Sequence, residues 1–169
     1  MKFGTKVIHS GIEPDQSSGA IMTPIFQTST YVQDGPGNHK GYEYARTQNP
    51  TRTVLQNNLA ALENGTDAIC FSSGLAAMDA IIKLLKSGDH VLASNDMYGG
   101  SFRLLDKIFK PFGIGTNLIP MQDLSIIESN ISSETKLIWI ETPTNPLLNI
   151  VDIKAVCELV KGKNILIDG

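Results

Sequence analysis

Hydrophobic and polar positions form two patterns along the chain, one typical of strands and one typical of helices. From residue 66 onward these two patterns alternate. Short apolar runs bounded by turn residues are typical of buried strands, whereas apolar residues three or four positions apart are typical of helices. The runs predict strands at 68–71, 90–93, 117–120, 136–141 and 164–168. The helical spacing predicts helices at 50–63, 75–86, 102–112, 123–131 and 153–161.

This alternation predicts an α/β fold with a parallel sheet that helices cover on both faces. In such sheets ligands bind beyond the carboxyl ends of the strands. The polar segments expected at those ends are 72–74, 95–100, 141–145 and Asp168. Their convergence on one rim predicts a ligand site there.

Residues 1–41 carry no sustained helical or strand period and are rich in Gly, Ser, Thr and Pro. An arm of this length without a core of its own is either disordered or laid over another surface. Its scattered apolar residues, such as Ile21, Met22 and Ile25, favour the second arrangement, with a neighbouring subunit as one candidate surface.

The next segment, 41–52, is a polar loop with two tyrosines and two arginines. A guanidinium and a phenol offered together suit an anionic ligand. The alternative is that the tyrosines cover apolar surface and the arginines are solvated.

A second anion-binding feature is the turn Ser72-Ser73-Gly74 between a predicted strand and a predicted helix. The backbone N–H groups at a helix N-terminus are unpaired within the helix, and phosphate groups bind there. For this segment alone the alternative is a tight turn without a ligand, because it matches no nucleotide-binding fingerprint.

Composition narrows the class of protein. Of the 169 residues 41% are hydrophobic, which is enough for one core, and a formal net charge of −3 disfavours nucleic acid and anionic membranes as partners. Two isolated cysteines, Cys70 and Cys157, predict a reducing compartment without a disulfide or zinc framework. Since the sequence shows no signal-peptide run and no membrane span, we expect a cytoplasmic protein.

The predicted rim combines backbone amides at Gly74, an aromatic ring at Tyr98, an amide at Asn145 and a carboxylate at Asp168. A flat, phosphorylated heteroaromatic fits this set, and pyridoxal phosphate (PLP) has these features. A nucleotide is the alternative, although no Walker or dinucleotide sequence follows a suitable strand. The three histidines show no metal-ligand spacing, and none lies on the rim to activate a serine.

Four motifs occur in order along the chain: YARTQNPTR at 44–52, SSGLAA at 72–77, YGGS at 98–101 and WIETPTNP at 139–146. Their order and spacing resemble the Cys/Met metabolism (transsulfuration) family of PLP enzymes. This family includes cystathionine γ-synthase, cystathionine γ-lyase, methionine γ-lyase and O-acetylhomoserine sulfhydrylases. The resemblance runs from about Gly4 to Asp168.

The resemblance implies roles for individual residues. Gly74 and Leu75 would bind the cofactor phosphate through their backbone amides. Tyr98 would stack on the pyridine ring and assist proton transfer as the catalytic residue. Asp168 would keep the ring nitrogen protonated, and Asn145 would lie near the ring hydroxyl.

Other residues are implied to act on a neighbouring subunit or on the substrate. Tyr44 and Arg46 would reach the cofactor phosphate of the neighbouring subunit. Glu43 and Arg103 are candidates for contact with a small amino-acid substrate, with solvated surface positions as the alternative.

The resemblance also implies the organisation of the chain. Residues 1–52 would form an extended arm that contacts the neighbouring subunit. Residues 53–169 would form the first part of the PLP-binding large domain of a fold-type I transferase. Full-length relatives are implied to be homotetramers built from dimers that share active sites.

Two features depart from the family pattern. The lysine that anchors the cofactor as a Schiff base belongs to a Ser-x-x-Lys-type segment beyond Asp168, which these residues do not include, and Gly169 stands where relatives usually carry Asn. The resemblance therefore implies transsulfuration in the full-length form and little activity from these residues alone. Within the family it favours γ-replacement on O-acyl-homoserine with cysteine, or γ-elimination of cystathionine, over the methionine γ-lyase reaction.

Two alternatives come from other classes of protein. One is a non-catalytic remnant that binds phosphate or pairs with a full-length subunit. The other is an unrelated α/β nucleotide-binding domain.

Overall fold

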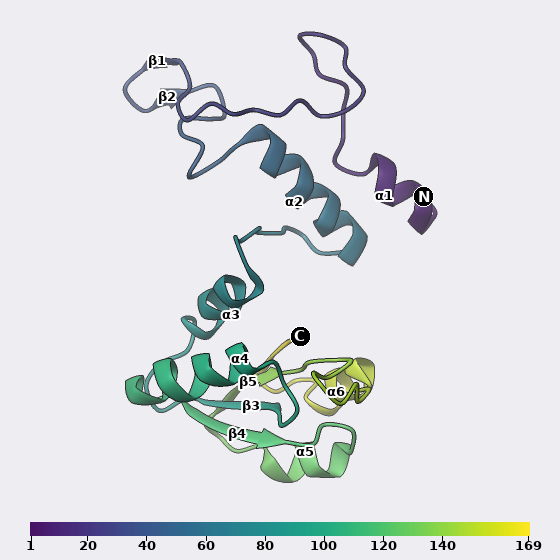
Figure 1. Ribbon diagram of the computed structural model, residues 1–169, viewed down its shortest axis with the longest axis vertical. Coiled ribbons are helices and arrows are strands. Elements are labelled where there is room, and N and C mark those ends of the chain that lie inside the picture. The colour runs from purple at the N-terminus through teal and green to yellow at the C-terminus, as the bar shows by residue number, and fades with distance from the viewer. The chain divides into compact units, whose positions relative to one another are not determined.

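The computed structural model describes residues 1–169, and the chain divides into two compact units, Met1–Phe71 and Ser72–Gly169 (Figure 1). The predicted boundary after residue 52 concerns contacts with a neighbouring subunit, and it stays a prediction. No helix in either unit combines the length and the apolarity that a membrane-spanning segment requires.

The first unit is organised around helix α2 (Pro50–Glu63). The Asn49 side chain caps its N-terminus by accepting hydrogen bonds from two backbone N–H groups of the first turn. Pro50 takes the first helical position, where its missing N–H costs nothing. Asn64 ends the helix in the left-handed conformation, with φ of 55°. These caps confirm the predicted helix and both of its ends.

A helix that the sequence pattern did not predict, α1 (Phe3–His9), packs against α2. Lys6 Nζ donates to the Ala61 carbonyl oxygen at 3.3 Å, and Asn58 Nδ2 donates to the Ser10 carbonyl oxygen at 2.8 Å. These partners lie 55 and 48 positions apart in the sequence. Local periodicity therefore gives no signal for α1, because its support comes from distant residues.

The arm after α1 lies along the start of α2. Asn49 Nδ2 donates to the Phe26 carbonyl oxygen at 2.9 Å, and the Thr51 hydroxyl donates to the Pro24 carbonyl oxygen at 2.8 Å. Further along, strands β1 (Gln33–Gly35) and β2 (Asn38–His39) pair as a short antiparallel hairpin. The arm is thus laid over the chain's own helix.

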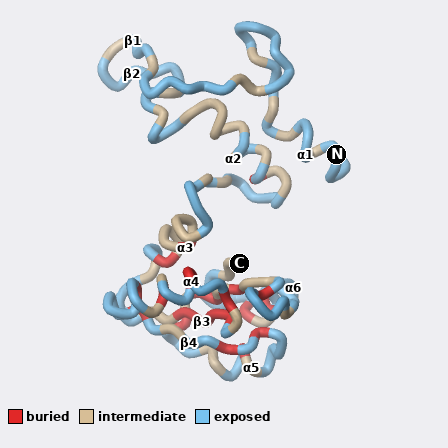
Figure 2. The backbone as a smooth tube through the Cα atoms, viewed as in Figure 1, coloured by how far each residue is buried: buried red, intermediate tan, exposed pale blue.

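The first unit nevertheless buries few side chains. Ala60 is its only buried residue (Figure 2). The arm side chains Ile21, Met22, Ile25 and Val32 are between 74% and 82% exposed. The expectation that the arm has no core of its own is confirmed.

The second unit is an α/β layer whose four parallel strands follow the order β4–β3–β5–β6. The strands are β3 (His90–Ser94), β4 (Gly115–Ile119), β5 (Thr135–Trp139) and β6 (Leu166–Asp168). The helical elements are α3 (Gly74–Ile82), α4 (Gly99–Arg103), the π-helical turn η1 (Leu104–Phe109), the 3₁₀ turn η2 (Lys110–Phe112), α5 (Leu124–Asn130) and α6 (Ile153–Leu159). A parallel sheet with flanking helices confirms the predicted fold class.

Two apolar clusters cover the two faces of this sheet. On the front face, α3 and η1 pack against Val91, Ala93 and Leu137. On the back face, α5 and α6 pack against Leu92 and Ile138. Neighbouring residues of a strand point to opposite faces, so β3 and β5 contribute to both clusters, whereas β4 and β6 contribute Ile119 and Ile167 to the back-face cluster. Figure 2 shows buried positions gathered around this sheet.

The strand predicted at 68–71 is absent, and this prediction was wrong. An extended segment becomes a strand only by pairing with a partner, and no strand pairs with this one. Its apolar side chains Ile69 and Phe71 are 74% and 45% exposed.

Two predicted helices differ from the structure in length or pitch. The helix predicted at 75–86 ends at Ile82, because the following turn tightens into hydrogen bonds from Leu84 to Ile81 and from Leu85 to Ile82. The stripe at 102–112 is divided among α4, η1 and η2 instead of forming one α-helix. Pro111 lies in the last of these turns and has no N–H to donate.

Candidate cofactor site

The strand order leaves a crevice at the carboxyl end of the sheet, between β3 and β5. The chain passes from β3 to the helices of the front face, whereas it passes from β5 to α6 on the back face. Segments that depart to opposite faces leave a gap between them, which is where open α/β sheets bind ligands. A cavity of about 380 Å³ opens at this point, lined by Ser73, Gly74, Leu75, Met78, Tyr98, Ser101 and Trp139.

Helix α3 presents unpaired backbone donors at this cavity. Its N-cap residue Ser73 uses its hydroxyl oxygen to accept the Ala76 N–H at 3.1 Å. The N–H groups of Gly74 and Leu75 have no acceptor within the chain. No atom lies within 4 Å of the position that a Cβ on Gly74 would take. Because the helix dipole adds partial positive charge, this end of α3 suits a phosphate group.

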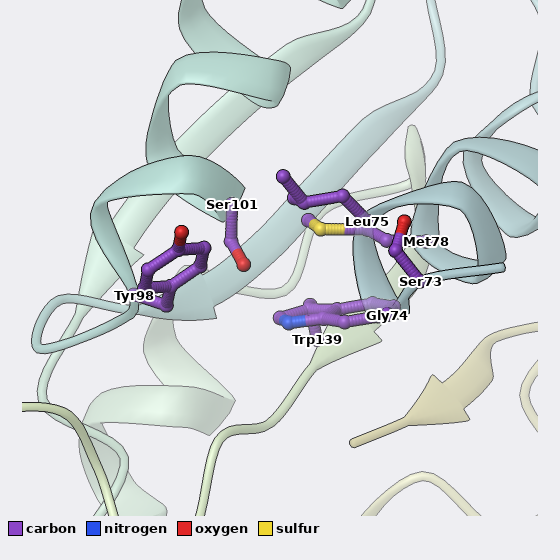
Figure 3. A pocket seen from close by; sticks show the side chains of 7 residues that line it. All are labelled: Ser73, Gly74, Leu75, Met78, Tyr98, Ser101 and Trp139. Carbon is purple, nitrogen blue, oxygen red and sulfur yellow. The ribbon is translucent and has the colours of Figure 1, made fainter.

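Two aromatic side chains flank the cavity. Tyr98 precedes α4 and is 49% exposed, and Trp139 ends β5 and is partly buried. Figure 3 shows Tyr98 and Ser101 facing Leu75 and Met78 across the hollow, with Trp139 at its lower edge in this view. Aromatic walls beside unpaired amides suit a flat ring that carries an anionic arm.

The ring of Tyr98 lies against the first turn of its own helix, and this contact requires glycine at position 100. A Cβ on Gly100 would stand 2.3 Å from Tyr98 Cε1 and 3.0 Å from Leu75 Cδ1. At Gly99, by contrast, the nearest atom to an added Cβ is Arg103 Nη1, at 3.4 Å. Gly100 therefore determines where the Tyr98 ring rests.

Asp168 lies beside the cavity without lining it. It is the register partner of Trp139 on the neighbouring parallel strand. Register partners on parallel strands project to the same face, so the Asp168 side chain leaves the sheet on the front face, as Trp139 does. Asn145 is exposed in the segment that follows β5 and does not line the cavity. Arg103 is likewise exposed and outside the lining.

In the first unit, Tyr44 and Arg46 form a pair of their own. The guanidinium carbon of Arg46 lies 4.8 Å from the centroid of the Tyr44 ring, a cation–π distance. Arg52 Nη2 donates to the Thr47 carbonyl oxygen at 2.7 Å and fixes the loop that carries the pair. Arg46 makes no ion pair, and Glu43 beside it is exposed. The loop thus offers an unneutralised cation.

Ser73 lies in the turn predicted to bind an anion, whereas sequence reasoning missed three other residues that line the cavity, namely Met78, Ser101 and Trp139. Trp139 reads as a buried strand residue because it ends an apolar run. The signal that could have identified Trp139 as a site residue is its position at the end of one strand, beside the parallel strand that ends in Asp168. No lysine lines the cavity.

The residues present fit PLP. The free amides of Gly74 and Leu75 suit its phosphate, the rings of Tyr98 and Trp139 suit its pyridine ring, and the cavity volume lies in the usual range for small ligands.

Comparison with known proteins agrees with this fit. The family model described as "Cys/Met metabolism PLP-dependent enzyme" matches residues 4–168. A probable cystathionine gamma-synthase of Herpetosiphon aurantiacus is 46% identical over 163 residues, which cover 96% of this chain and 51% of that protein. A cystathionine beta-lyase of Lactococcus lactis subsp. cremoris is 46% identical over 162 residues, which cover 96% of this chain and 43% of that protein.

Solved structures give the same result. The metB protein of Corynebacterium glutamicum superposes with a TM-score of 0.95 at 43% identity, covering 99% of this chain and 44% of that one. Cystathionine gamma-lyase of Lactobacillus plantarum, complexed with L-serine, superposes with a TM-score of 0.93 at 43% identity, with the same coverage. The chain spans about half or less of the length of these relatives. This chain belongs to the Cys/Met metabolism family of PLP-dependent enzymes.

Proposed function

We propose that this chain carries the cofactor-binding part of a PLP-dependent transsulfuration enzyme. In its full-length form this enzyme performs γ-replacement on O-acyl-homoserine with cysteine, or γ-elimination of cystathionine. The observation that carries the proposal is the cavity where the free amides of α3 meet the rings of Tyr98 and Trp139.

Each site residue has a physical task in this proposal. PLP, when bound, supplies an electron sink for a carbanion on the amino-acid substrate. The amides of Gly74 and Leu75 hold the phosphate, and the Tyr98 ring stacks on the pyridine while its phenol moves a proton at the substrate. The Asp168 carboxylate holds a proton on the ring nitrogen. Asn145 lies near the ring hydroxyl.

The first unit serves a neighbouring copy of the chain. Tyr44 and Arg46 reach the phosphate of the adjacent subunit, and the unpaired charge of Arg46 supports this assignment. The exposed apolar side chains of the arm supply a surface for a dimer-based homotetramer. Glu43 and Arg103 contact the amino-acid substrate.

The comparisons support the cofactor site more strongly than the choice of reaction. The chain is 46–47% identical to a cystathionine gamma-synthase and to a cystathionine beta-lyase alike. Side chains that select between such reactions therefore lie largely outside these residues.

The non-catalytic alternative uses the same cavity. Its support is that no lysine lines this cavity. Lys83 pairs with Asp79 and Lys161 pairs with Glu158, both on exposed helix surfaces. Without an anchoring amine at the cavity, PLP binds these residues reversibly. Borohydride then fixes no cofactor to a single peptide of this chain.

Equilibrium binding tests the proposed function. Trp139 is the only tryptophan and lines the cavity, so its fluorescence reports on occupancy. PLP should quench this fluorescence at saturation, whereas pyridoxal, which lacks the phosphate, should bind at least tenfold more weakly. A chain that binds only inorganic phosphate supports the non-catalytic alternative, and quenching by neither PLP nor phosphate contradicts both proposals.

A further inference from the structure

Two segments at the carboxyl end of the sheet hold each other through reciprocal carboxylates. The β3 loop (95–98) carries Tyr98 into the cavity, and the β5 loop (140–152) carries Asn145. Each loop contributes one acidic side chain, Asp96 and Glu141 respectively, that accepts hydrogen bonds from the other loop. Neither acid lines the cavity.

Asp96 organises the β5 loop from outside that loop. One of its oxygens accepts the Thr144 hydroxyl, the Leu147 N–H at 3.0 Å and the Asn149 side-chain amide at 3.4 Å. Thr144 is only 3% exposed, and its hydroxyl oxygen accepts the Asn149 N–H at 2.8 Å. The conformation of the loop around Asn145 therefore depends on a carboxylate that comes from β3.

Glu141 acts in the opposite direction, on the β3 loop. Its two carboxylate oxygens lie 3.1 Å and 3.0 Å from the backbone nitrogen of Tyr98, whose N–H they accept. The Glu141 N–H donates to the buried Ser94 hydroxyl at 3.2 Å, which ties the acid to the end of β3. Tyr98 is the residue before α4, so this bond also fixes the direction in which that helix starts.

We infer that Asp96 and Glu141 are positioning residues that hold Tyr98 and the Asn145 loop in one arrangement at the cavity. A charged acceptor on a backbone N–H is stronger than a neutral one, and two such ties in opposite directions prevent either loop from moving alone. The cofactor then meets walls that are already ordered, which spares the binding step the cost of ordering them. The link to PLP rests on the proposed function, whereas the mutual restraint of the loops does not.

Hydrogen exchange of individual amides in the ligand-free chain tests the restraint. Glu141→Ala removes the acceptor, and Glu141→Gln keeps an oxygen without the charge. We expect the Tyr98 amide to exchange roughly tenfold faster in Glu141→Ala and at an intermediate rate in Glu141→Gln. Asp96→Ala and Asp96→Asn should do the same to the Leu147 amide.

Asp152→Asn is the matched control, because the Asp152 carboxylate accepts a backbone N–H of α6, that of Ala155 at 2.9 Å, on the back face. It should leave the Tyr98 and Leu147 amides at wild-type rates. Amides of β3 and β5 should keep wild-type rates in every variant. If Glu141→Ala speeds exchange through the whole sheet, that variant has lost stability as a whole, and the test rests on Glu141→Gln. A Tyr98 amide that exchanges at the wild-type rate in Glu141→Gln overturns the inference.

PLP titration of the same variants separates this inference from the proposed function. The Ala variants should lose about tenfold in affinity, with most of it recovered in Gln and Asn. Unchanged PLP affinity together with faster exchange overturns the positioning role. A wild-type chain that binds no PLP contradicts the proposed function, and the exchange rates still decide whether the two loops restrain each other.

Discussion

Trp139 and Asp168 are register partners on the neighbouring parallel strands β5 and β6, and both project to the front face of the sheet. This pairing puts a carboxylate next to the aromatic edge of the cavity. If it bonds the protonated ring nitrogen of PLP, Asp168→Asn should weaken PLP binding roughly tenfold, because a charge-assisted hydrogen bond becomes a neutral one. Fluorescence titration measures the change.

Glu158→Gln removes an exposed carboxylate of α6 and is the control for net charge. It should bind PLP as the wild-type chain does. Equal affinities for Asp168→Asn and Glu158→Gln would show that Asp168 makes no contact with the cofactor.

Gly100→Ala should displace the Tyr98 ring without unfolding the chain. The new methyl group needs the space that Tyr98 Cε1 occupies, and a side chain yields more easily than the backbone. Affinity for PLP should fall, while Gly99→Ala, with only the end of the Arg103 side chain nearby, should leave it unchanged. Urea unfolding should show both variants folded, with Gly99→Ala stabilised by up to about 1 kcal/mol. A Gly100→Ala chain with wild-type affinity would disprove the link between this glycine and the ring.

Gly11→Ala should loosen α1 from α2. Gly11 has φ of 72°, and its Cβ would stand 2.7 Å from Asn57 Cβ and 2.9 Å from the Asn58 nitrogen. Gly19→Ala is the matched control, since Gly19 has φ of 73° and open space around it. Both changes carry the left-handed backbone cost of about 1–2 kcal/mol, and Gly11→Ala adds about 1–3 kcal/mol for overpacking.

Hydrogen exchange in α1 measures the difference between these two variants. The α1 amides should exchange faster in Gly11→Ala than in Gly19→Ala. Matching rates would mean that the close contact of Gly11 with α2 does not support α1.

Acid should weaken the cap of α5. The Ser125 hydroxyl, at 2.6 Å, and the Ser125 N–H, at 2.8 Å, hold the pKa of Asp123 below its ordinary value of 3.8. A carboxyl whose folded-state pKa is lowered stabilises the fold above its unfolded-state pKa, and this contribution is lost as the pH falls through the folded-state pKa. The free energy of unfolding should therefore fall more steeply below about pH 4 in the wild type than in Asp123→Asn, whose amide caps without titrating. Parallel pH curves for the two chains would contradict this assignment.

The sequence predicted the second unit better than the first, and the reason is physical. The central strands β3 and β5 are buried on both faces, so their apolar runs predict the sheet directly, and the edge strands β4 and β6 pair with them. Helix α1 depends instead on side-chain contacts with a helix about fifty positions away, which no local pattern encodes. The segment 68–71 shows the opposite error, since an apolar run alone does not supply a pairing partner.

The candidate site was predictable where chemistry coincides with a strand end. Tyr98 follows that rule, since it comes after β3 and lines the cavity, whereas Asn145 does not line it. Ser73 and Gly74 also line the cavity, although the strand predicted before them is absent. Asp96 and Glu141 lie in the segments predicted to form the rim, but sequence reasoning assigned neither of them a role, because an acid in a loop is usually a solvated surface group. Their importance depends on two loops, more than 40 positions apart, lying side by side.

The separation of the two apolar clusters by the sheet has a consequence for evolutionary change. Ile127 and Val156, both 0% exposed, belong to the back-face cluster and do not line the cavity. Conservative exchanges among such residues adjust heat tolerance by about 0.5–1.5 kcal/mol each while ligand recognition stays as it was. Lineages adapting to different temperatures can therefore diverge on one side of the sheet and inherit the chemistry of the other side unchanged.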